Sequence, residues 1–178
     1  MMRGRIVPIL VLASAGALGQ KADSPVAAVG EFSNMRYTEE HAYGYSIQLW
    51  RAGETLFGLF LASEGLAGDT PTGLVENVRF DPATRKLSFQ AKLTMGIRID
   101  GDGASRPSQD LFEFDGRLNQ NELAGTLKHS DRLQSPASAK TERVRLKRQA
   151  QTTIETFQNY QEWKTRTAEI LKLRGPKW

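Results

Sequence analysis

The fold is decided by residues 42–95, which open with AYGYSIQLW and close with KLSFQAKLTM. In the opening stretch Tyr43, Tyr45 and Ile47 alternate with small or polar residues, and the closing stretch alternates in the same way. A period of two places apolar side chains on one face of a β-strand and polar side chains on the other. Both stretches are therefore predicted to be strands with one buried face and one face toward water.

Six further stretches have the composition of strands, being rich in β-branched, aromatic or leucine residues and closed by Gly, Pro, Asn or Asp. They are residues 31–38, 55–64, 72–80, 111–118, 122–129 and 141–148. Most of the connections are too short to hold a crossover helix, so the eight strands are expected to form an antiparallel meander. Closing such a sheet into a barrel removes its exposed edges. The sequence predicts a mainly β fold, a single antiparallel meander β-barrel of about eight strands.

One predicted strand and the C-terminal region call for a second packing layer. In residues 56–63 both faces are apolar, with Leu56 and Phe60 on one and Phe57, Leu59 and Leu61 on the other. Such a strand must be covered on both sides. Residues 151–174 predict a helix with an apolar stripe that ends at Gly175-Pro176. We expect this helix to pack on the face of Phe57, Leu59 and Leu61; a partner subunit is the alternative cover.

The order of these elements resembles the calycin architecture of lipocalins and their relatives over residues 31–174. The resemblance rests on the order of strands and helix alone. Lipocalins carry a Gly-x-Trp near the first barrel strand, where this chain has Gly44-Tyr45-Ser46, and it also lacks their paired cysteines. What the resemblance implies is a small secreted β-barrel; it carries no particular ligand over to this chain.

Three segments follow from the composition along the chain. Residues 1–19 resemble a cleavable signal peptide, with Arg3 and Arg5 before a short apolar run and small residues before Gln20. Residues 20–149 are expected to form the barrel domain, and residues 150–178 the amphipathic helix and tail of the same domain. The chain has no cysteine, which excludes disulfides and a lipoprotein anchor. We therefore expect a secreted or periplasmic protein.

The positive charge gathers near the C-terminus. The whole chain has a formal net charge of +4, and residues 140–178 contain 10 Lys and Arg against 4 Asp and Glu. Such a region can bind anionic lipid or an acidic partner, or simply form a solvated surface that complements the barrel. Nucleic acid is not expected, because no aromatic residues for base stacking are interleaved with the basic residues of 143–148.

The sequence assigns no catalytic machinery and no cofactor. No pairing of a nucleophile with a base and no carboxylate dyad can be assigned, so a non-enzymatic role is favoured. The two histidines, His41 and His129, lie at unrelated strand ends and do not predict a metal site. Residues 100–103 begin like a calcium loop, but Ser105 and Leu111 stand where the required Gly and Glu belong.

The predicted inward face suggests where a ligand could bind. A barrel lined by aromatic side chains can hold a small apolar or amphipathic molecule, and the candidate ligand-binding residues are Tyr43, Tyr45, Glu76, Phe89, Phe112 and Phe114. A core filled by its own side chains is the alternative, and a bulge in the strand would turn Glu76 outward. The competing functional hypothesis is an envelope or extracellular interaction module with no small-molecule ligand.

Overall fold

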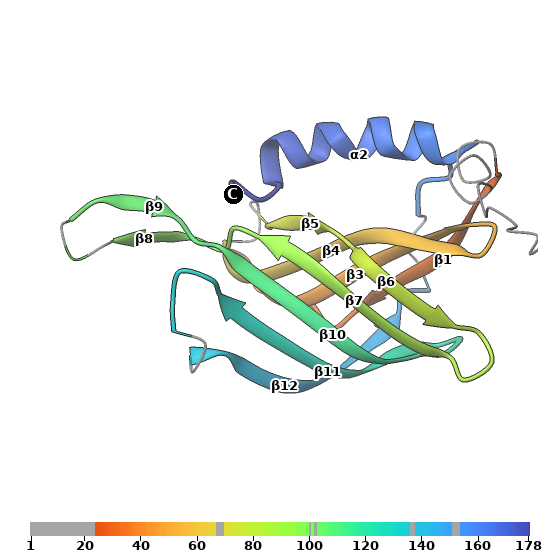
Figure 1. Cartoon of the computed structure of the whole chain (residues 1–178), viewed down its shortest axis with the longest axis horizontal. Helices are drawn as coiled ribbons and strands as arrows, with labels where there is room; N and C mark the ends of the chain where they lie inside the picture. The colour runs from red at the N-terminus through yellow and green to blue at the C-terminus, as the bar shows by residue number, and fades with distance from the viewer. Residues whose placement is uncertain (1–23, 67–69, 100, 102, 136–137, 151–153) are drawn as a thin grey trace, which may run out of the picture.

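The protein is described by a computed structural model over residues 24–66, 70–99, 101, 103–135, 138–150 and 154–178 (Figure 1). The predicted signal peptide, residues 1–19, lies outside these residues. The strands are β1 (Val26–Ser33), β2 (Arg36–Tyr37), β3 (His41–Ala52), β4 (Thr55–Leu66), β5 (Thr72–Leu74), β6 (Glu76–Asp81), β7 (Lys86–Leu93), β8 (Ile97–Ile99), β9 (Ser105–Pro107), β10 (Asp110–Leu118), β11 (Glu122–Asp131) and β12 (Lys140–Arg148). One helix, α2 (Tyr160–Arg174), follows them.

The prediction of an antiparallel barrel with one C-terminal helix is confirmed. The main sheet has the order β5-β4-β3-β1-β12-β11-β10-β7-β6, and every pair in it is antiparallel. Strand β1 pairs with β12, so the two ends of the barrel sequence meet inside the sheet. The sheet therefore ends at β5 and β6, which are consecutive along the chain, and the barrel is nearly closed there.

This seam splits the single strand predicted over residues 72–80. The backbone N–H of Val75, between β5 and β6, donates to the carbonyl oxygen of Gly58 at 2.9 Å. A Cβ at Gly73 would collide with the carbonyl oxygen of Lys92, so glycine lets β5 lie against β7 where the sheet edges meet. The first half of the predicted strand pairs with β4 and the second half with β7, because the barrel closes between them.

A bulge at Asn77 changes which residues of β6 face inward. Asn77 has φ +52°, and the pairing of β6 with β7 shifts between Glu76 and Arg79. Val75 is buried in the barrel core, and Val78 packs against the same core. Glu76 lies between them on the outer side, so the expectation that it faces the lumen is wrong. The extra residue of the bulge reverses the alternation.

The helix begins later than the pattern predicted. Asn159 is the N-cap; its side chain accepts a hydrogen bond from the Glu162 backbone N–H at 2.9 Å. Glu162 in turn accepts from the Gln158 backbone N–H at 2.7 Å. These reciprocal bonds fix the start of α2 at Tyr160. Of the residues predicted to precede it in the helix, 151–153 lie outside the described residues and 154–159 form an irregular segment.

Helix α2 covers the outer apolar face of β3 and β4, as predicted (Figure 1). Phe57 and Leu59 on β4 and Trp50 on β3 pack with Phe157 and Trp163 in a cluster separate from the barrel core. Trp163 and Thr167 are the buried residues of the helix. The doubly apolar strand is thus covered by this chain's own helix, which removes the need for a partner subunit on that face.

Between the strands predicted over residues 86–95 and 111–118, the chain forms a projecting hairpin. Strands β8 and β9 pair with each other, with Arg98 opposite Arg106, and extend beyond the end of the barrel as an arm (Figure 1). Ile97 and Ile99 on this arm are each 76% exposed. Short strands with Gly and polar neighbours gave too weak an alternation to be recognised as strands.

Candidate functional site

Side chains fill the barrel lumen. Tyr45, Phe89, Phe112 and Phe114, four of the predicted ligand-binding residues, are buried in one cluster together with Phe60. The ring centroids of Phe60 and Phe112 are 5.3 Å apart, and those of Phe89 and Phe114 are 5.1 Å apart. These are contact distances for packed aromatic rings. The four residues are brought together as expected, but against one another, as in small barrels with a solid interior.

Tyr45 carries the polar group of this aromatic cluster. Its hydroxyl donates a hydrogen bond to Glu142 Oε1 at 2.6 Å. Burial, followed by this bond to Glu142 and the negative charges of Glu142 and Glu64, raises the pKa of Tyr45 well above its ordinary value. The phenol therefore stays protonated, and its hydrogen-bonding capacity is used within the protein.

Tyr43 lies outside the lumen. Its side chain is 48% exposed, and its ring stacks on that of His41 with the centroids 6.0 Å apart. Both residues belong to the start of β3, beyond the last layer of the core. Tyr43 follows the alternation of β3, but it precedes Tyr45, the first residue of this strand in the barrel core, so the expectation that Tyr43 lines the lumen is wrong.

A groove of about 600 Å³ lies outside the lumen, between α2 and the seam of the barrel. One wall is formed by the start of β4 and by the chain around the seam, and the other by one face of α2. The apolar lining consists of Leu56, Phe57, Leu74, Val75, Val78, Tyr160, Trp163, Ala168 and Leu171. The groove exists because β4 and β6 do not pair there, and one helix cannot cover the whole of a curved seam.

The two tryptophans in the cluster under α2 differ in their hydrogen bonding. Trp50 and Trp163 are both buried, with ring centroids 6.0 Å apart. The indole N–H of Trp50 donates to the Glu155 carbonyl oxygen at 2.9 Å. The indole N–H of Trp163, a groove residue, is buried without an acceptor among the described residues. A buried donor without a partner is unfavourable, and such groups are uncommon in native proteins.

The polar lining of the groove lies beside this apolar wall. It consists of Thr55, Glu76, Asn77, Lys164 and Thr167. Glu76 forms an ion pair with Lys92 at 3.6 Å, and both side chains are about two-fifths exposed. Glu76 is thus the only one of the six predicted residues that lines this groove. An apolar wall next to charged and hydroxyl groups suits an amphipathic molecule.

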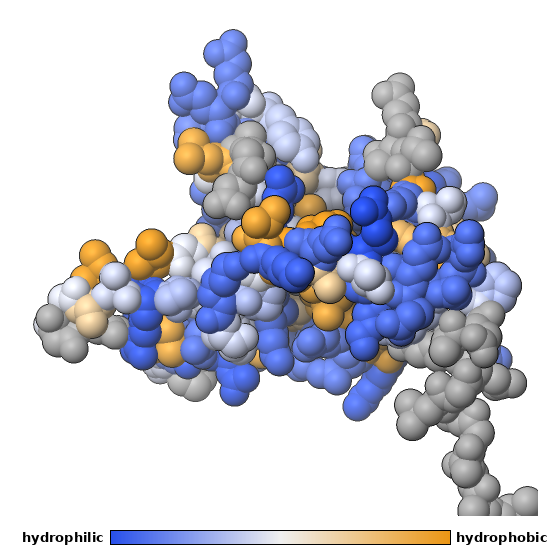
Figure 2. All heavy atoms as spheres, turned by 90° about the horizontal axis from the view of Figure 1, so that it is seen from above, coloured by the Kyte–Doolittle hydropathy of each residue, from blue (hydrophilic) through white to orange (hydrophobic). Residues whose placement is uncertain are grey.

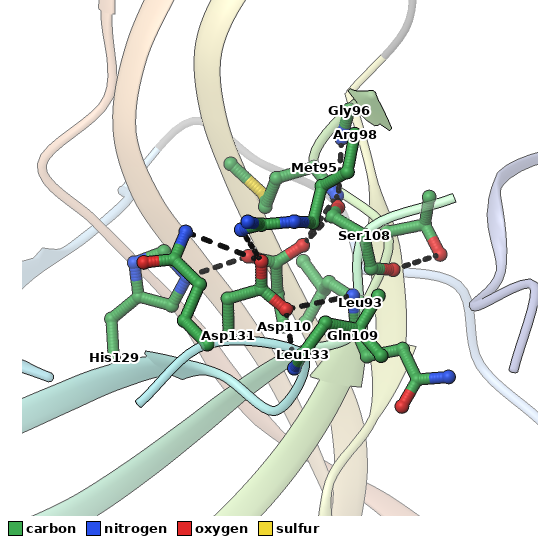
Figure 3. A network of polar contacts seen from close by, with 12 residues as sticks. Leu93, Met95, Gly96, Arg98, Ser108, Gln109, Asp110, His129, Asp131 and Leu133 are labelled. Atoms are coloured by element: carbon green, nitrogen blue, oxygen red, sulfur yellow. Dashed lines mark hydrogen bonds and ion pairs between the residues drawn. The ribbon is translucent and has the colours of Figure 1, made fainter. Parts of the chain in front are cut away.

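A second polar group of side chains lies at the base of the arm (Figure 3). Asp110 Oδ1 is hydrogen bonded to His129 Nε2 at 2.7 Å, and Asp110 Oδ2 accepts from the Ser108 hydroxyl and from the Met95 backbone N–H. Burial raises the pKa of Asp110, but the bonds from His129, Ser108 and Met95 outweigh it and hold the pKa below its ordinary value. The carboxylate is therefore ionised in the folded protein.

These residues have the types of a catalytic triad but not its connections. In a triad the histidine takes the proton of the serine hydroxyl. Here the carboxylate of Asp110 lies between Ser108 and His129, and the Ser108 hydroxyl oxygen accepts from the backbone N–H groups of Met95 and Gly96 at 3.0 Å each. Next to them, Arg98 donates to Asp131 at 2.6 Å. Ser108, Asp110 and His129, together with the Arg98–Asp131 pair, hold the arm to β10 and β11, and we call them the anchor.

Sequence reasoning found only part of these two sites. The doubly apolar strand and the helix stripe predicted the packing layer under α2, but not the groove beside it, which depends on where the barrel closes. Among Ser108, Asp110 and His129, only His129 stands out in the sequence, as one of two histidines; Ser108 and Asp110 lie between the strands predicted over residues 86–95 and 111–118. Alternation is a pattern within one strand, so it cannot predict which residues meet at the base of a hairpin.

Comparison with protein-family models, curated proteins and solved structures finds no match to this chain. Within the described part of the chain, no three His, Cys, Asp or Glu side chains gather in a way that could hold a metal ion. In the same residues, α2 falls short of the length and apolar character that a membrane-spanning helix needs.

Proposed function

We propose that this protein is an exported, non-enzymatic binding barrel that holds a small amphipathic ligand in the groove between α2 and the seam. The groove volume of about 600 Å³ lies within the range of roughly 300–1,000 Å³ typical of small-molecule sites. The single observation that carries the proposal is that Trp163, a residue of the groove lining, has a buried indole N–H without an acceptor among the described residues.

The chemistry of the ligand follows from the lining. Its apolar part would lie along Phe57, Leu74 and Leu171, and an acceptor oxygen would face the indole N–H of Trp163. Its polar end would lie near Lys164 or the Glu76–Lys92 pair. The lumen residues Tyr45, Phe89, Phe112 and Phe114 would support the site from within the barrel, because they hold the strands on which the groove is built.

Native mass spectrometry of the protein recovered from its own host tests this proposal. We expect an added mass of roughly a few hundred daltons, lost on collisional activation, as suits a molecule that fills a groove of this size. Ala168→Trp would place an indole in the groove from an exposed position of α2 and should abolish the adduct. Ala83→Trp, at an exposed position in the β6–β7 turn away from the groove, is the matched control and should retain it.

Two results would contradict the proposal. A bare protein mass for the wild type, recovered under conditions that preserve other carrier complexes, would mean that the groove holds no ligand. An adduct that persists in Ala168→Trp as strongly as in Ala83→Trp would place the bound molecule elsewhere.

A further inference from the structure

Exposed apolar side chains gather at one end of the barrel. Seven large apolar or aromatic residues of the described chain are 40% exposed or more. Ile170 on α2 is one of them. The other six lie at the end of the barrel where β3 begins, β4 ends, the arm leaves β7 and α2 ends. They are Tyr37, Tyr43, Leu66, Ile97, Ile99 and Leu173. Scattered exposed apolar residues are normal, but gathering at one end marks an interaction surface.

Four of these residues form what we name the arm face: Leu66, Ile97, Ile99 and Leu173. Three of them, Leu66, Ile97 and Leu173, line one hollow of about 500 Å³ between the end of β4, the arm and the end of α2. Ile99 lies two residues beyond Ile97 on β8 and is equally exposed. Figure 2 shows apolar groups on the projecting arm, at the left of the view.

The anchor at the base of the arm determines where the arm face points. Arg98, between Ile97 and Ile99, bonds to Asp131 at 2.6 Å. Successive side chains of a strand point to opposite sides, so the two isoleucines lie on the side away from Arg98. The backbone N–H of Ser108 donates to the Gly96 carbonyl oxygen at 2.9 Å, which closes the base of the hairpin. The exposure of the isoleucines is thus built into the fold.

Cations border this face. Arg174 and Lys177 line the same hollow as Leu66 and Leu173, where Glu64 is the one carboxylate among the described residues of the lining. The ammonium group of Lys177 donates to the Lys172 carbonyl oxygen at 3.0 Å, which places it at the C-terminal end of α2. Trp178, whose indole N–H donates to the Leu93 carbonyl oxygen at 2.8 Å, holds the tail in this position.

We propose that the arm face docks on an anionic lipid membrane surface. The isoleucines and leucines would enter the boundary between headgroups and acyl chains, while Arg174 and Lys177 contact lipid phosphates. A second copy of the chain fits less well. In a two-fold dimer the same face meets itself, so its cations would approach one another.

Vesicle flotation tests this inference with the protein recovered from its own host. One set of vesicles is phosphatidylcholine alone, and the other contains about 30% phosphatidylglycerol to supply the anionic surface. We expect binding to the anionic vesicles at least about tenfold tighter than to the neutral ones, and weaker binding as salt screens the cations. The double variant Ile97→Asn/Ile99→Asn should lose about tenfold or more in affinity, because it removes apolar area from the interface.

Two charge variants separate a local contact from an effect of net charge. Arg174→Gln/Lys177→Gln removes two cations at the arm face, and Arg143→Gln/Lys147→Gln removes two exposed cations from β12. We expect the first to weaken binding to anionic vesicles several-fold more than the second. Unchanged thermal unfolding in each variant shows that the fold is retained.

Equal losses in the two charge variants would overturn the inference, as would vesicle binding that survives Ile97→Asn/Ile99→Asn in full. Light scattering tests the remaining possibility, that a second copy of the chain occupies the arm face. If the wild type forms a dimer that dissociates in the isoleucine variant and neither binds vesicles, the arm face is a contact between two copies. None of these outcomes depends on whether the groove beside α2 holds a ligand, so this inference and the proposed function fail separately.

Discussion

The barrel lumen and the layer under α2 are both built from aromatic side chains, yet only the second leaves a groove. In the lumen, the rings of Tyr45, Phe60 and Phe112 lie within 6.0 Å of one another, and the hydroxyl of Tyr45 is bonded to Glu142. Under α2, Phe57 and Trp163 lie 4.6 Å apart, but the Trp163 indole N–H has no acceptor among the described residues. The nearly closed sheet surrounds the lumen, whereas one helix covers the outer layer from one side.

The largest effect is expected in the lumen. Phe60 is 1% exposed and contacts the rings of Tyr45, Phe89 and Phe112. Phe60→Ala should reduce the free energy of unfolding by about 3–5 kcal/mol, because the nearly closed sheet around the lumen prevents the cavity from collapsing. Urea unfolding of the variant and the wild type measures this. A loss below about 1 kcal/mol, the range of tolerant surface sites, would mean that the lumen is not a close-packed core.

The second largest loss of stability is expected on mutation of the anchor at the base of the arm, and this loss should depend on pH. Asp110→Asn leaves His129 and Ser108 without their ionised partner and should cost about 1–3 kcal/mol at pH 7. The pKa of Asp110 is lower in the folded protein than its ordinary value of 3.8, so its contribution is complete at neutral pH and is lost as the pH falls from that value through the lower pKa of the folded state.

Chemical unfolding at pH 7 and at about pH 3 checks this sign. The difference in unfolding free energy between wild type and Asp110→Asn should shrink at the lower pH, where Asp110 of the unfolded wild-type chain takes up a proton. A difference that is unchanged or larger at low pH would show that the anchor does not depend on the ionised form of Asp110.

The two tryptophans give a smaller and more selective comparison. Trp50→Phe and Trp163→Phe remove the same atoms from one cluster, but only the Trp50 indole N–H has an acceptor among the described residues. In ligand-free protein, Trp50→Phe should be more destabilising by about 1 kcal/mol, the net value of a hydrogen bond. Thermal or urea unfolding of both variants measures the difference. Equal losses would show that Trp163 has an acceptor after all.

The smallest effect is expected at the seam. Glu76 and Lys92 form a half-exposed pair at 3.6 Å, and such pairs contribute little. Glu76→Gln should therefore change the unfolding free energy by less than about 0.5 kcal/mol. A loss of 2 kcal/mol or more, typical of a buried charge that loses its partner, would instead place the carboxylate inside the barrel.

Local periodicity predicted the strands and the helix, but not the bulge in β6 or the residue at which α2 begins. The alternation in β3, β7 and β10 identified Tyr45, Phe89 and Phe112 as buried, and the apolar pattern of residues 56–63 correctly required a cover, which α2 supplies. A bulge that turns Glu76 outward is one alternative that the sequence allows, and the structure has it at Asn77. One inserted residue reverses a period of two and leaves no trace in composition. The late start of α2 depends in the same way on a cap at Asn159.

The sequence by itself determined the class of fold: an antiparallel barrel whose strands carry one apolar face, with a helix to cover the strand that has two. These properties depend on neighbours two to four residues apart, which any chain displays in its order of residues. Only the tertiary structure decided that the lumen is filled, that the barrel closes between β5 and β6, and that a groove lies beside Trp163. Those features depend on how side chains distant in sequence share one volume, and no local pattern records that.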